Sequence, residues 1–438
     1  MAKRAVRMRV LVLGGYGLVG LEIIRALTAA GYAVTGFGRS PETGRRLSQD
    51  VRWNHGDMRR MLRPEDWAAH LSDMDAVVNA AGALQDGPKD DLQAVHATAI
   101  RALITACERR GVSRFVQISA PGAAPEARTA FLTTKSAGDA AVRASSLDWT
   151  ILKPGLVISA GSYGGTTLLR TLAAFPMVQP MVLGEARIQT VAAADVAEAV
   201  RAVLAKTVAS RHDYDLVEDT PHTLADVLRA FRRWAARDDA LWSWRLPRWL
   251  GFAVGRVADL AGWFGWRSPL RTTALKSIAD GVLGDSSAWR EAGGFPLKSL
   301  GQTLQTLPST VQERTFGRVQ LVFPALLLVL AGFWLASGVI GIVRREEAEA
   351  VLAGRVAPEI AQWLVGSGIV ADLLIAWGLL WRRWVRRAAW ASILVSLGYL
   401  AAGTWLTPEL WADPLGPFVK VFPAMALALT VAALVEDR

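Results

Sequence analysis

The sequence predicts an α/β Rossmann-type domain with a doubly wound parallel sheet, followed by an all-α membrane bundle of four transmembrane helices. Two observations carry this prediction. From residue 8 to about 155, short apolar runs alternate with helical patterns, and beyond residue 310 four long apolar segments follow one another. The mean hydropathy of +0.26, with 52% hydrophobic residues, is high for a wholly soluble protein, and the excess lies in the C-terminal part. A length of 438 residues suits two or three domains.

The alternation in the first part is typical of βαβ units on a parallel sheet. A further strand is expected at 189–191, before a helix with Asp195 as its N-cap, and Thr223 with Asp226 resembles a capping box opening a helix to about Trp234. The expected strands are 9–13, 33–37, 76–80, 114–119 and 149–152, and the expected helices are 18–30, 92–110 and 129–145.

Residues 242–268 contain five tryptophans and four arginines on a helical apolar pattern. Such a segment suits a helix lying in the bilayer interface, and a packed amphipathic helix covering the second lobe is the alternative. We therefore divide the chain into a nucleotide-binding domain at 1–240, a second lobe at 241–310 and a membrane domain at 311–438.

The four apolar segments of the membrane domain each meet the roughly 20-residue length of a spanning helix. Asp372 is the one charge in the second segment and should face the bundle interior, and Lys420 in the fourth should reach the nearer interface. The predicted spans are 319–343, 360–381, 388–406 and 415–435.

The charge pattern favours a membrane rather than nucleic acid as the partner of this chain. The chain has a net charge of +10. The turn between the second and third spans, RRWVRR, contains four arginines, whereas the loop between the third and fourth has no basic residue. The positive-inside rule then places this turn and the N-terminal domain in the cytoplasm. The apolar run at 10–13 is too short for a signal-peptide core and is interpreted as a first strand.

The glycine run in VLVLGGYGLVG follows the first strand and opens the first helix. Gly14 turns the chain, Gly17 allows the backbone to approach a pyrophosphate, and Gly20 allows close packing of helix on strand. This placement predicts a dinucleotide site. The candidate residues of this segment are Gly14, Gly15, Tyr16, Gly17, Leu18, Val19 and Gly20.

The residues after the second strand favour NADP(H) over NAD(H). Arg39, followed by Ser40, stands where NAD-specific sites carry an acidic residue, and an arginine pairs with a 2′-phosphate. Asp57, followed by Met58, comes after the third strand, where a carboxylate accepts a hydrogen bond from the adenine amino group.

The order GGYGLVG, GDM, NAAG, VQIS, a helix bearing Lys135 and DWTILKPG resembles the short-chain dehydrogenase/reductase superfamily over residues 8–305. It is closest to the atypical NAD(P)H-binding branch, which includes epimerase-like proteins and an accessory subunit of respiratory complex I. Residues 315–436 resemble the DoxX-like family of four-helix membrane proteins. The resemblance implies that Ala80, Ala81, Gly82, Lys135 and Pro154 also line the cofactor site.

The catalytic pattern of that superfamily is incomplete here. Ser119 and Lys135 match two of its three positions, but residues 131–135 read FLTTK, so Phe131 replaces the acid/base tyrosine. Lys135 is still expected to bind the nicotinamide ribose. Tyr163 is the one nearby tyrosine that we nominate as a proton donor, and a loop aromatic closing the pocket is its alternative role.

No spacing of histidines or acidic residues predicts a metal site, and Cys107 is expected to be buried in a helix. The expected function is a bacterial inner-membrane, NADP(H)-binding oxidoreductase acting on a quinone, isoprenoid or other lipid. The rival hypothesis is a non-catalytic NADPH-binding scaffold or assembly subunit of a membrane complex. A sugar-nucleotide epimerase is disfavoured because it needs the missing tyrosine. Membrane lipid and an apolar substrate are the expected partners, with a membrane-protein partner or a second copy left open.

Overall fold

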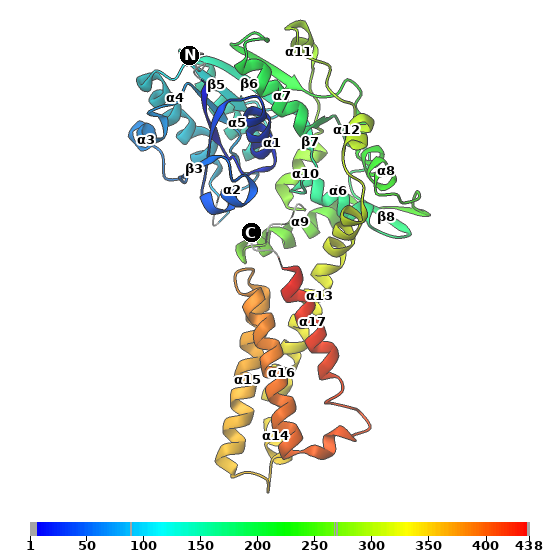
Figure 1. The fold of residues 1–438 in the computed structure, drawn as a ribbon. Coiled ribbons are helices and arrows are strands. Elements are labelled where there is room, and N and C mark those ends of the chain that lie inside the picture. Colours follow the sequence, from blue (N-terminus) through cyan, green and yellow to red (C-terminus); the bar gives the residue numbers. More distant parts are fainter. Residues whose placement is uncertain (1–6, 88–89, 267, 269, 436–438) are drawn as a thin grey trace. The chain divides into compact units, whose positions relative to one another are not determined.

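The computed structural model describes residues 7–87, 90–266, 268 and 270–435. The chain forms two compact units. The first comprises Met1–Asp259 and Ser268–Arg314, and the second comprises Leu260–Arg267 and Thr315–Arg438. The α/β elements all lie in the first unit, and the long apolar helices belong to the second (Figure 1).

A seven-stranded sheet forms the centre of the first unit, in the order β11-β6-β5-β4-β1-β2-β3. Every neighbouring pair in it is parallel, so the carboxyl ends of all seven strands meet at one edge. The strands are β1 (Arg9–Leu13), β2 (Ala33–Gly38), β3 (Arg52–His55), β4 (Ala76–Asn79), β5 (Arg114–Ile118), β6 (Asp148–Pro154) and β11 (His212–Leu216).

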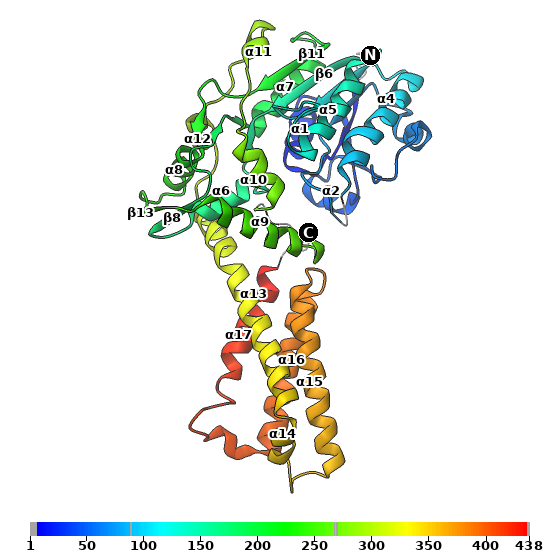
Figure 2. The same cartoon turned by 180° about the vertical axis from the view of Figure 1, so that it is seen from behind.

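Helices cover both faces of this sheet because its inner strands are apolar on both sides (Figures 1 and 2). In β1, Val10 and Val12 belong to one core with α1 and α7, whereas Leu11 and Leu13 belong to a second core with α4. Cys107 is buried in α4, as expected. The helices of this part are α1 (Leu18–Ala29), α2 (Pro41–Leu47), α3 (Ala68–Leu71), α4 (Ala99–Arg110), α5 (Ala130–Arg143) and α7 (Ala193–Leu204), with the helical turns η1 (Pro64–Trp67) and η2 (Ala94–Thr98).

The second lobe of the first unit is built from short strand pairs and helices. Thr223 and Asp226 form the predicted capping box at the start of α8. Its elements are β7 (Leu156–Ile158), β8 (Val178–Met181), β9 (Arg187–Ile188), β10 (Thr190–Ala192), β12 (His222–Thr223), β13 (Trp242–Arg245), α6 (Gly165–Ala173), α8 (Leu224–Trp234), α9 (Arg248–Trp263), α10 (Thr272–Ala279), α11 (Ser287–Glu291) and α12 (Leu300–Thr306).

Two expectations for the first unit were wrong. Helix α7 begins at Ala193 with Ala192 as its N-cap, and Asp195 is instead buried and paired with Lys298. The tryptophan-rich segment is not one helix, because residues 242–245 form β13 alongside β8 and α9 begins only at Arg248. Both differences arise from partners distant in sequence, which local patterns do not reveal.

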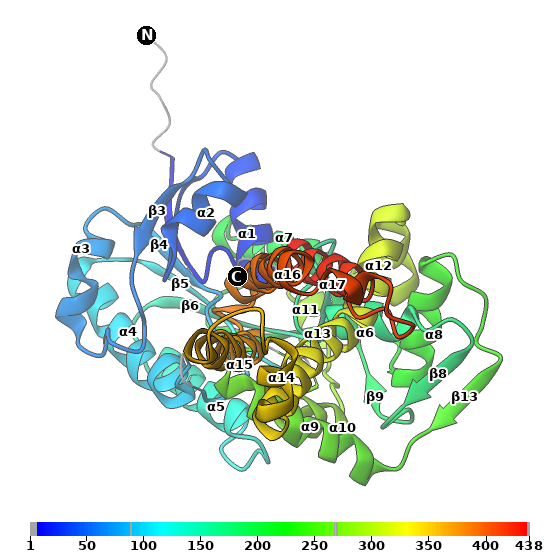
Figure 3. The same ribbon diagram turned by 90° about the horizontal axis from the view of Figure 1, so that it is seen from below.

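The second unit contains three helices long and apolar enough to cross a membrane, and a fourth that is shorter. Helices α15 and α16 pack side by side, as do α16 and α17 (Figure 3). The helices are α13 (Val311–Val343), α14 (Arg345–Val351), α15 (Pro358–Leu380), α16 (Val385–Leu406), the turn η3 (Pro408–Trp411) and α17 (Val421–Leu434).

The fourth predicted span, 415–435, is too long. Helix α17 covers only 14 residues and begins at Val421, because Leu415 to Lys420 form turns. The other three spans fall on α13, α15 and α16, although α13 starts eight residues before the predicted 319. Asp372 is 4% exposed and lies inside the helix bundle, as predicted.

Candidate functional site: the carboxyl edge of the sheet

The glycine run forms the predicted turn between β1 and α1. Gly14 follows β1 with φ +67°, and Gly17 is the N-cap of α1. A Cβ on Gly20 would lie 2.2 Å from the carbonyl oxygen of Gly14, so no larger residue fits there without movement of the backbone. Leu18 and Val19 start the helix, whose first N–H groups point out of its N-terminus beside β1. This tight turn into a helix N-terminus fits a dinucleotide pyrophosphate.

The end of β2 places Arg39 and Ser40 beside the glycine turn. The backbone N–H of Ser40 donates to the hydroxyl of Tyr16 at 3.2 Å, which ties the two loops together. Arg39 is 40% exposed at its side chain and pairs with Asp90 at 3.0 Å. The basic group of Arg39 therefore lies at the predicted position, and it is paired with Asp90, which no local sequence pattern predicts.

Asp57 lies after β3 and has a partner of its own. Arg59 binds both of its carboxylate oxygens, with its Nε 3.0 Å from Oδ1 and 3.1 Å from Oδ2. This bidentate pairing lowers the pKa of Asp57, although burial acts in the opposite direction. Met58, which lies between Asp57 and Arg59 in the sequence, is buried. Arg59 is a second arginine at this edge that was not predicted.

The loop after β4 contains Ala80, Ala81 and Gly82 and is held by buried side chains. The Asn79 Oδ1 accepts from the backbone N–H of Ala81 at 3.1 Å. The His96 Nε2 accepts from the backbone N–H of Ala83 at 3.1 Å, so its Nδ1 carries the hydrogen and donates to Thr134. Burial lowers the pKa of His96 to about 2, and the ring is a neutral structural support.

Ser119 and Lys135 are brought together after β5, as the resemblance implied. The Lys135 Nζ donates to the backbone carbonyl of Ile118 at 2.8 Å, and burial lowers its pKa to about 8. The Ser119 hydroxyl donates to Asp139, one turn beyond Lys135 on α5. Burial raises the pKa of Asp139, while the Ser119 bond and the charge of Lys135 oppose the rise. Asp139 was not predicted.

Phe131 lies one turn before Lys135 on α5 and packs edge-on against His96, with ring centroids 5.7 Å apart. Tyr163 lies in the loop between β7 and α6 and is 49% exposed. In the described part of the chain, no hydrogen bond or ring contact joins Tyr163 to Ser119 or Lys135. Pro154, by contrast, is buried at the carboxyl end of β6.

Most of the predicted residues thus follow the ends of parallel strands and share one edge of the sheet. The edge includes the point between β1 and β4 where the strand order reverses, which is where ligands bind in open α/β sheets. The strand order places these residues at one edge of the sheet, whereas Tyr163 lies in the loop between β7 and α6; their roles in binding stay a prediction.

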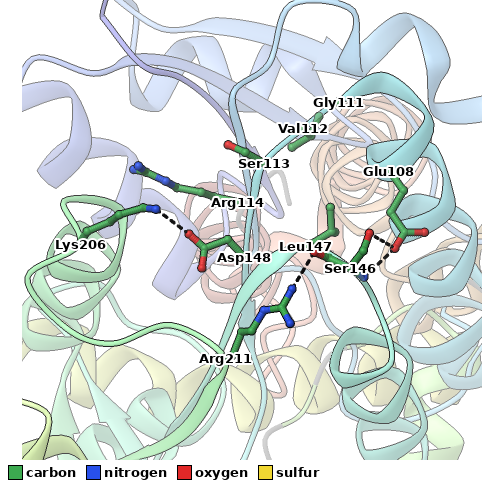
Figure 4. A pocket seen from close by; sticks show the side chains of 10 residues that line it. All are labelled: Glu108, Gly111, Val112, Ser113, Arg114, Ser146, Leu147, Asp148, Lys206 and Arg211. Atoms are coloured by element: carbon green, nitrogen blue, oxygen red, sulfur yellow. Dashed lines mark hydrogen bonds and ion pairs between the residues drawn. The ribbon is translucent and has the colours of Figure 1, made fainter.

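A groove of about 560 Å³ lies at the opposite, amino-terminal edge, near the first residues of β5 and β6 (Figure 4). Its charged groups are already paired: Lys206 with Asp148 at 3.2 Å, and Arg211 with the carbonyl of Ser146 at 2.9 Å. Glu108 accepts from the Ser146 hydroxyl at 2.8 Å. These contacts tie together the amino-terminal ends of the strands. None of the residues that line the groove belongs to the predicted site.

Comparison with known families agrees with this division of the chain. Residues 14–207 match a family described as NAD(P)H-binding, and residues 331–429 match the DoxX-like family. A curated relative, an NAD(P)H azoreductase from Xenophilus azovorans, is 29% identical over 147 residues, or 33% of this chain. The match spans about half of that relative, 47% of its length.

Two solved structures share the fold over roughly 70% of the chain. A UDP-glucose 4-epimerase from Thermotoga maritima has a TM-score of 0.52 at 14% identity, covering 72% of this chain and all of that one. A triphenylmethane reductase from Citrobacter, complexed with NADP(H), has a TM-score of 0.52 at 19% identity. It covers 69% of this chain and 100% of its own. At these identities the likeness shows the fold alone.

Proposed function

This chain joins an NAD(P)H-binding, epimerase-like Rossmann domain to a DoxX-like domain, and we propose that it is a membrane-anchored reductase of an apolar substrate. Within the expected class of quinones, isoprenoids and other lipids, a conjugated acceptor such as a quinone fits the site best. The observation that carries the proposal is the set of residues at the carboxyl edge of the sheet. This edge has a glycine turn and a buried lysine, but it has Phe131 in place of the tyrosine.

The missing tyrosine limits the substrates that this edge can serve. Bound NADP(H) supplies a hydride, which carries two electrons, and the acceptor needs one further proton. A simple carbonyl needs that proton from a nearby acid in the transition state. A quinone spreads the negative charge over its ring and second oxygen, so water can supply the proton afterwards. Phe131 offers such a ring an apolar surface.

The roles of the chain's own residues follow from their contacts. Lys135, fixed on the Ile118 carbonyl, is placed to donate to a ribose hydroxyl at this edge. Ser119 is engaged with Asp139 and therefore positions α5 against β5 rather than donating to substrate. Tyr163 remains a candidate only for covering the site from the β7–α6 loop.

The name of the curated relative supports a conjugated substrate. That relative is an NAD(P)H azoreductase, and an azo group is a conjugated acceptor.

We assign the preference for NADP(H) to the arginines near the end of β2. Arg39 is exposed beside the glycine turn, and its planar group suits a 2′-phosphate. The charge of Arg39 also lowers the pKa of Asp57, so Arg39 and Arg59 both act on one small region. The acidic partner of Arg39, Asp90, would have to share it with the phosphate.

We assign to the membrane domain the role of anchoring the chain in the lipid phase that would hold an apolar substrate. With the RRWVRR turn in the cytoplasm, the chain is a multi-pass protein of the bacterial inner membrane with its N-terminal domain inside the cell. Trp242, Trp244 and Trp249 on β13 and α9 are 59%, 59% and 69% exposed, and Arg245 and Arg248 stand between them. Exposed tryptophans beside arginines suit lipid headgroups, so this surface is assigned to contact lipid.

A non-catalytic NADPH-binding scaffold is the second candidate. The observation that favours it is the same Phe131, together with the engagement of Ser119 by Asp139. In this case the nucleotide would stabilise the chain within a membrane complex, with a membrane protein or a second copy as the partner.

The two candidates differ in turnover. Purified full-length protein in lipid nanodiscs should oxidise NADPH when a short-chain quinone is added, with one quinol formed per NADPH. The absorbance of NADPH reports the rate, and a variant of the glycine turn, Gly20→Ala, serves as the matched control. Tight binding of NADPH without oxidation by quinones or by a membrane lipid extract would favour the scaffold.

A further inference from the structure

The membrane bundle contains a polar cluster that no part of the proposed function uses. Asp372 on α15 is 4% exposed and accepts two hydrogen bonds from neighbouring helices. The Ser337 hydroxyl on α13 lies 2.6 Å from Oδ2, and the Tyr399 hydroxyl on α16 lies 2.7 Å from Oδ1. The carboxyl group therefore joins three helices.

No cation balances a negative charge at this position within the described residues. The Arg345 side chain approaches α15 near Gly366, six residues before Asp372, and pairs with Glu349 at 2.8 Å. Along their own helices, Arg318, Glu359 and Arg386 stand roughly 20 Å or more from the cluster at 1.5 Å per residue. Apart from Asp372 itself, the charged residues of α13, α14, α15 and α16 are Glu313, Arg314, Arg318, Arg345, Glu346, Glu347, Glu349, Glu359, Arg386 and Arg387.

An unbalanced carboxylate is costly in an apolar bundle, whereas a neutral carboxyl group is not. The neutral group must donate its own hydrogen, and the cluster contains a suitable acceptor. The Tyr399 hydroxyl also lies 3.2 Å from the backbone carbonyl of Gly368. Tyr399 can therefore donate to Gly368 while its oxygen accepts from Asp372.

In both protonation states, every polar hydrogen of the cluster consequently has an acceptor. In the ionised state, Ser337 and Tyr399 each donate to Asp372. In the neutral state, Ser337 still donates to Oδ2, Asp372 donates to Tyr399, and Tyr399 donates to Gly368. Only the hydroxyl hydrogen of Tyr399 has to turn between the two states.

We propose that Asp372 is a proton-binding site within the membrane bundle and that Tyr399 is its relay. Tyr399 is 41% exposed at the surface of its helix, so its hydroxyl connects the buried carboxyl group with the outside of the bundle. On release, the proton of Asp372 passes to the oxygen of Tyr399 while the original phenolic proton passes to a base on the outer side of the bundle, which we take to be a water molecule that penetrates to this depth. Uptake follows the same bonds in reverse.

Infrared spectroscopy of the full-length protein in nanodiscs tests this site directly. Wild type should show the carbonyl stretch of a neutral carboxyl group that disappears reversibly as the pH is raised, and Asp372→Asn should lack that band. Tyr399→Phe should move the band to higher frequency, because the carboxyl hydrogen loses its acceptor. Ser392→Ala is the matched control, since it removes the 2.7 Å bond from Trp334 elsewhere in the bundle and should leave the band in place.

Two results would overturn the proposal: no titrating carboxyl band in wild type at any pH at which the protein stays folded, or a band that persists in Asp372→Asn. If Asp372→Asn does not fold, Asp372→Glu and Tyr399→Phe replace it. A band unchanged in both of these variants then assigns the signal to another residue and removes the inference. The result is independent of NADPH oxidation, which none of these measurements involves.

Discussion

Each unit of this protein buries one aspartate that accepts a hydrogen bond from a serine, and the two aspartates are balanced in different ways. In the first unit, Asp139 accepts from Ser119 and has Lys135 one turn away on the same helix. In the second, Asp372 accepts from Ser337 and has the hydroxyl of Tyr399 in place of a cation. The charge of Lys135 opposes the rise in the pKa of Asp139, whereas in the bundle a hydroxyl group, which can donate or accept a hydrogen bond, stands in place of a cation.

The comparison extends to the missing catalytic group. The bundle places a tyrosine hydroxyl beside its buried acid, while the nucleotide edge has Phe131 where its relatives by resemblance carry a tyrosine. The α/β unit thus carries a glycine turn and a buried lysine at its candidate site, whereas the bundle carries hydroxyl groups beside its buried carboxyl group.

The largest expected effect comes from comparing a glycine of α1 in the first unit with a glycine of α13 in the second. Gly20→Ala should weaken NADPH binding by roughly 100-fold or more, because its Cβ would lie 2.2 Å from the Gly14 oxygen. Gly332→Ala in α13 meets nothing within 4 Å and should leave binding unchanged. Fluorescence titration with NADPH measures both. Equal binding by both variants would mean that the glycine turn does not form the nucleotide site.

The charge balance at Asp139 predicts a pH dependence of stability. Lys135 has a folded pKa of about 8 against 10.5 unfolded, so between these values the unfolded chain binds more protons. Stability should therefore rise with pH across this window, by up to about 3 kcal/mol, as the cost of burying the charged lysine is relieved.

Thermal unfolding of wild type and Lys135→Met in parallel isolates this contribution. The difference in Tm between the two should change in favour of wild type from about pH 8 to about pH 10.5. Parallel curves over that range would show that Lys135 is not charged and buried in the folded state.

Restoring the hydroxyl at Phe131 tests how far the nucleotide edge differs from its relatives. Phe131→Tyr should raise NADPH-dependent reduction of simple carbonyl compounds by about ten- to a hundredfold, because an acid then lies one turn before Lys135. Phe131→Leu is the control for changed packing against His96. Should neither activity nor cofactor turnover respond to the tyrosine, its absence does not limit the reaction.

The smallest expected effect concerns cofactor choice. Arg39→Gln should weaken NADPH binding by about tenfold and leave NADH binding unchanged, because only the 2′-phosphate loses a partner. Arg60→Gln removes another exposed arginine of the same region and should change neither. A loss of equal size for both nucleotides would place Arg39 outside the 2′-phosphate site.

The strands and the glycine turn were predictable because they rest on local patterns. The expected strand at 9–13 is β1 itself, and the helix expected from 18 begins at Leu18. The same holds for Lys135, which follows the motif order, and for Asp372, whose burial follows from the cost of a charge in lipid.

The roles of residues whose partners are distant in the sequence could not be predicted. His96, which lies in η2, accepts a hydrogen bond from the loop after β4. Arg59 donates a hydrogen bond to Asp57, and no sequence pattern predicts this bond. Strand β13 was mistaken for helix because its ladder partner, β8, lies about 60 residues earlier. In each case the tertiary contact decides the role, and the local composition fits more than one outcome.

The short fourth helix has a consequence for the surrounding lipid. At 1.5 Å per residue the 14 residues of α17 span about 21 Å, whereas a typical hydrocarbon core is about 30 Å thick. Such a hydrophobic mismatch draws the bilayer inward beside one helix while α15 and α16 span its full width. The bilayer should therefore be thinner beside α17 than beside α15 and α16, and this local thinning would shorten the path by which an apolar molecule leaves the membrane.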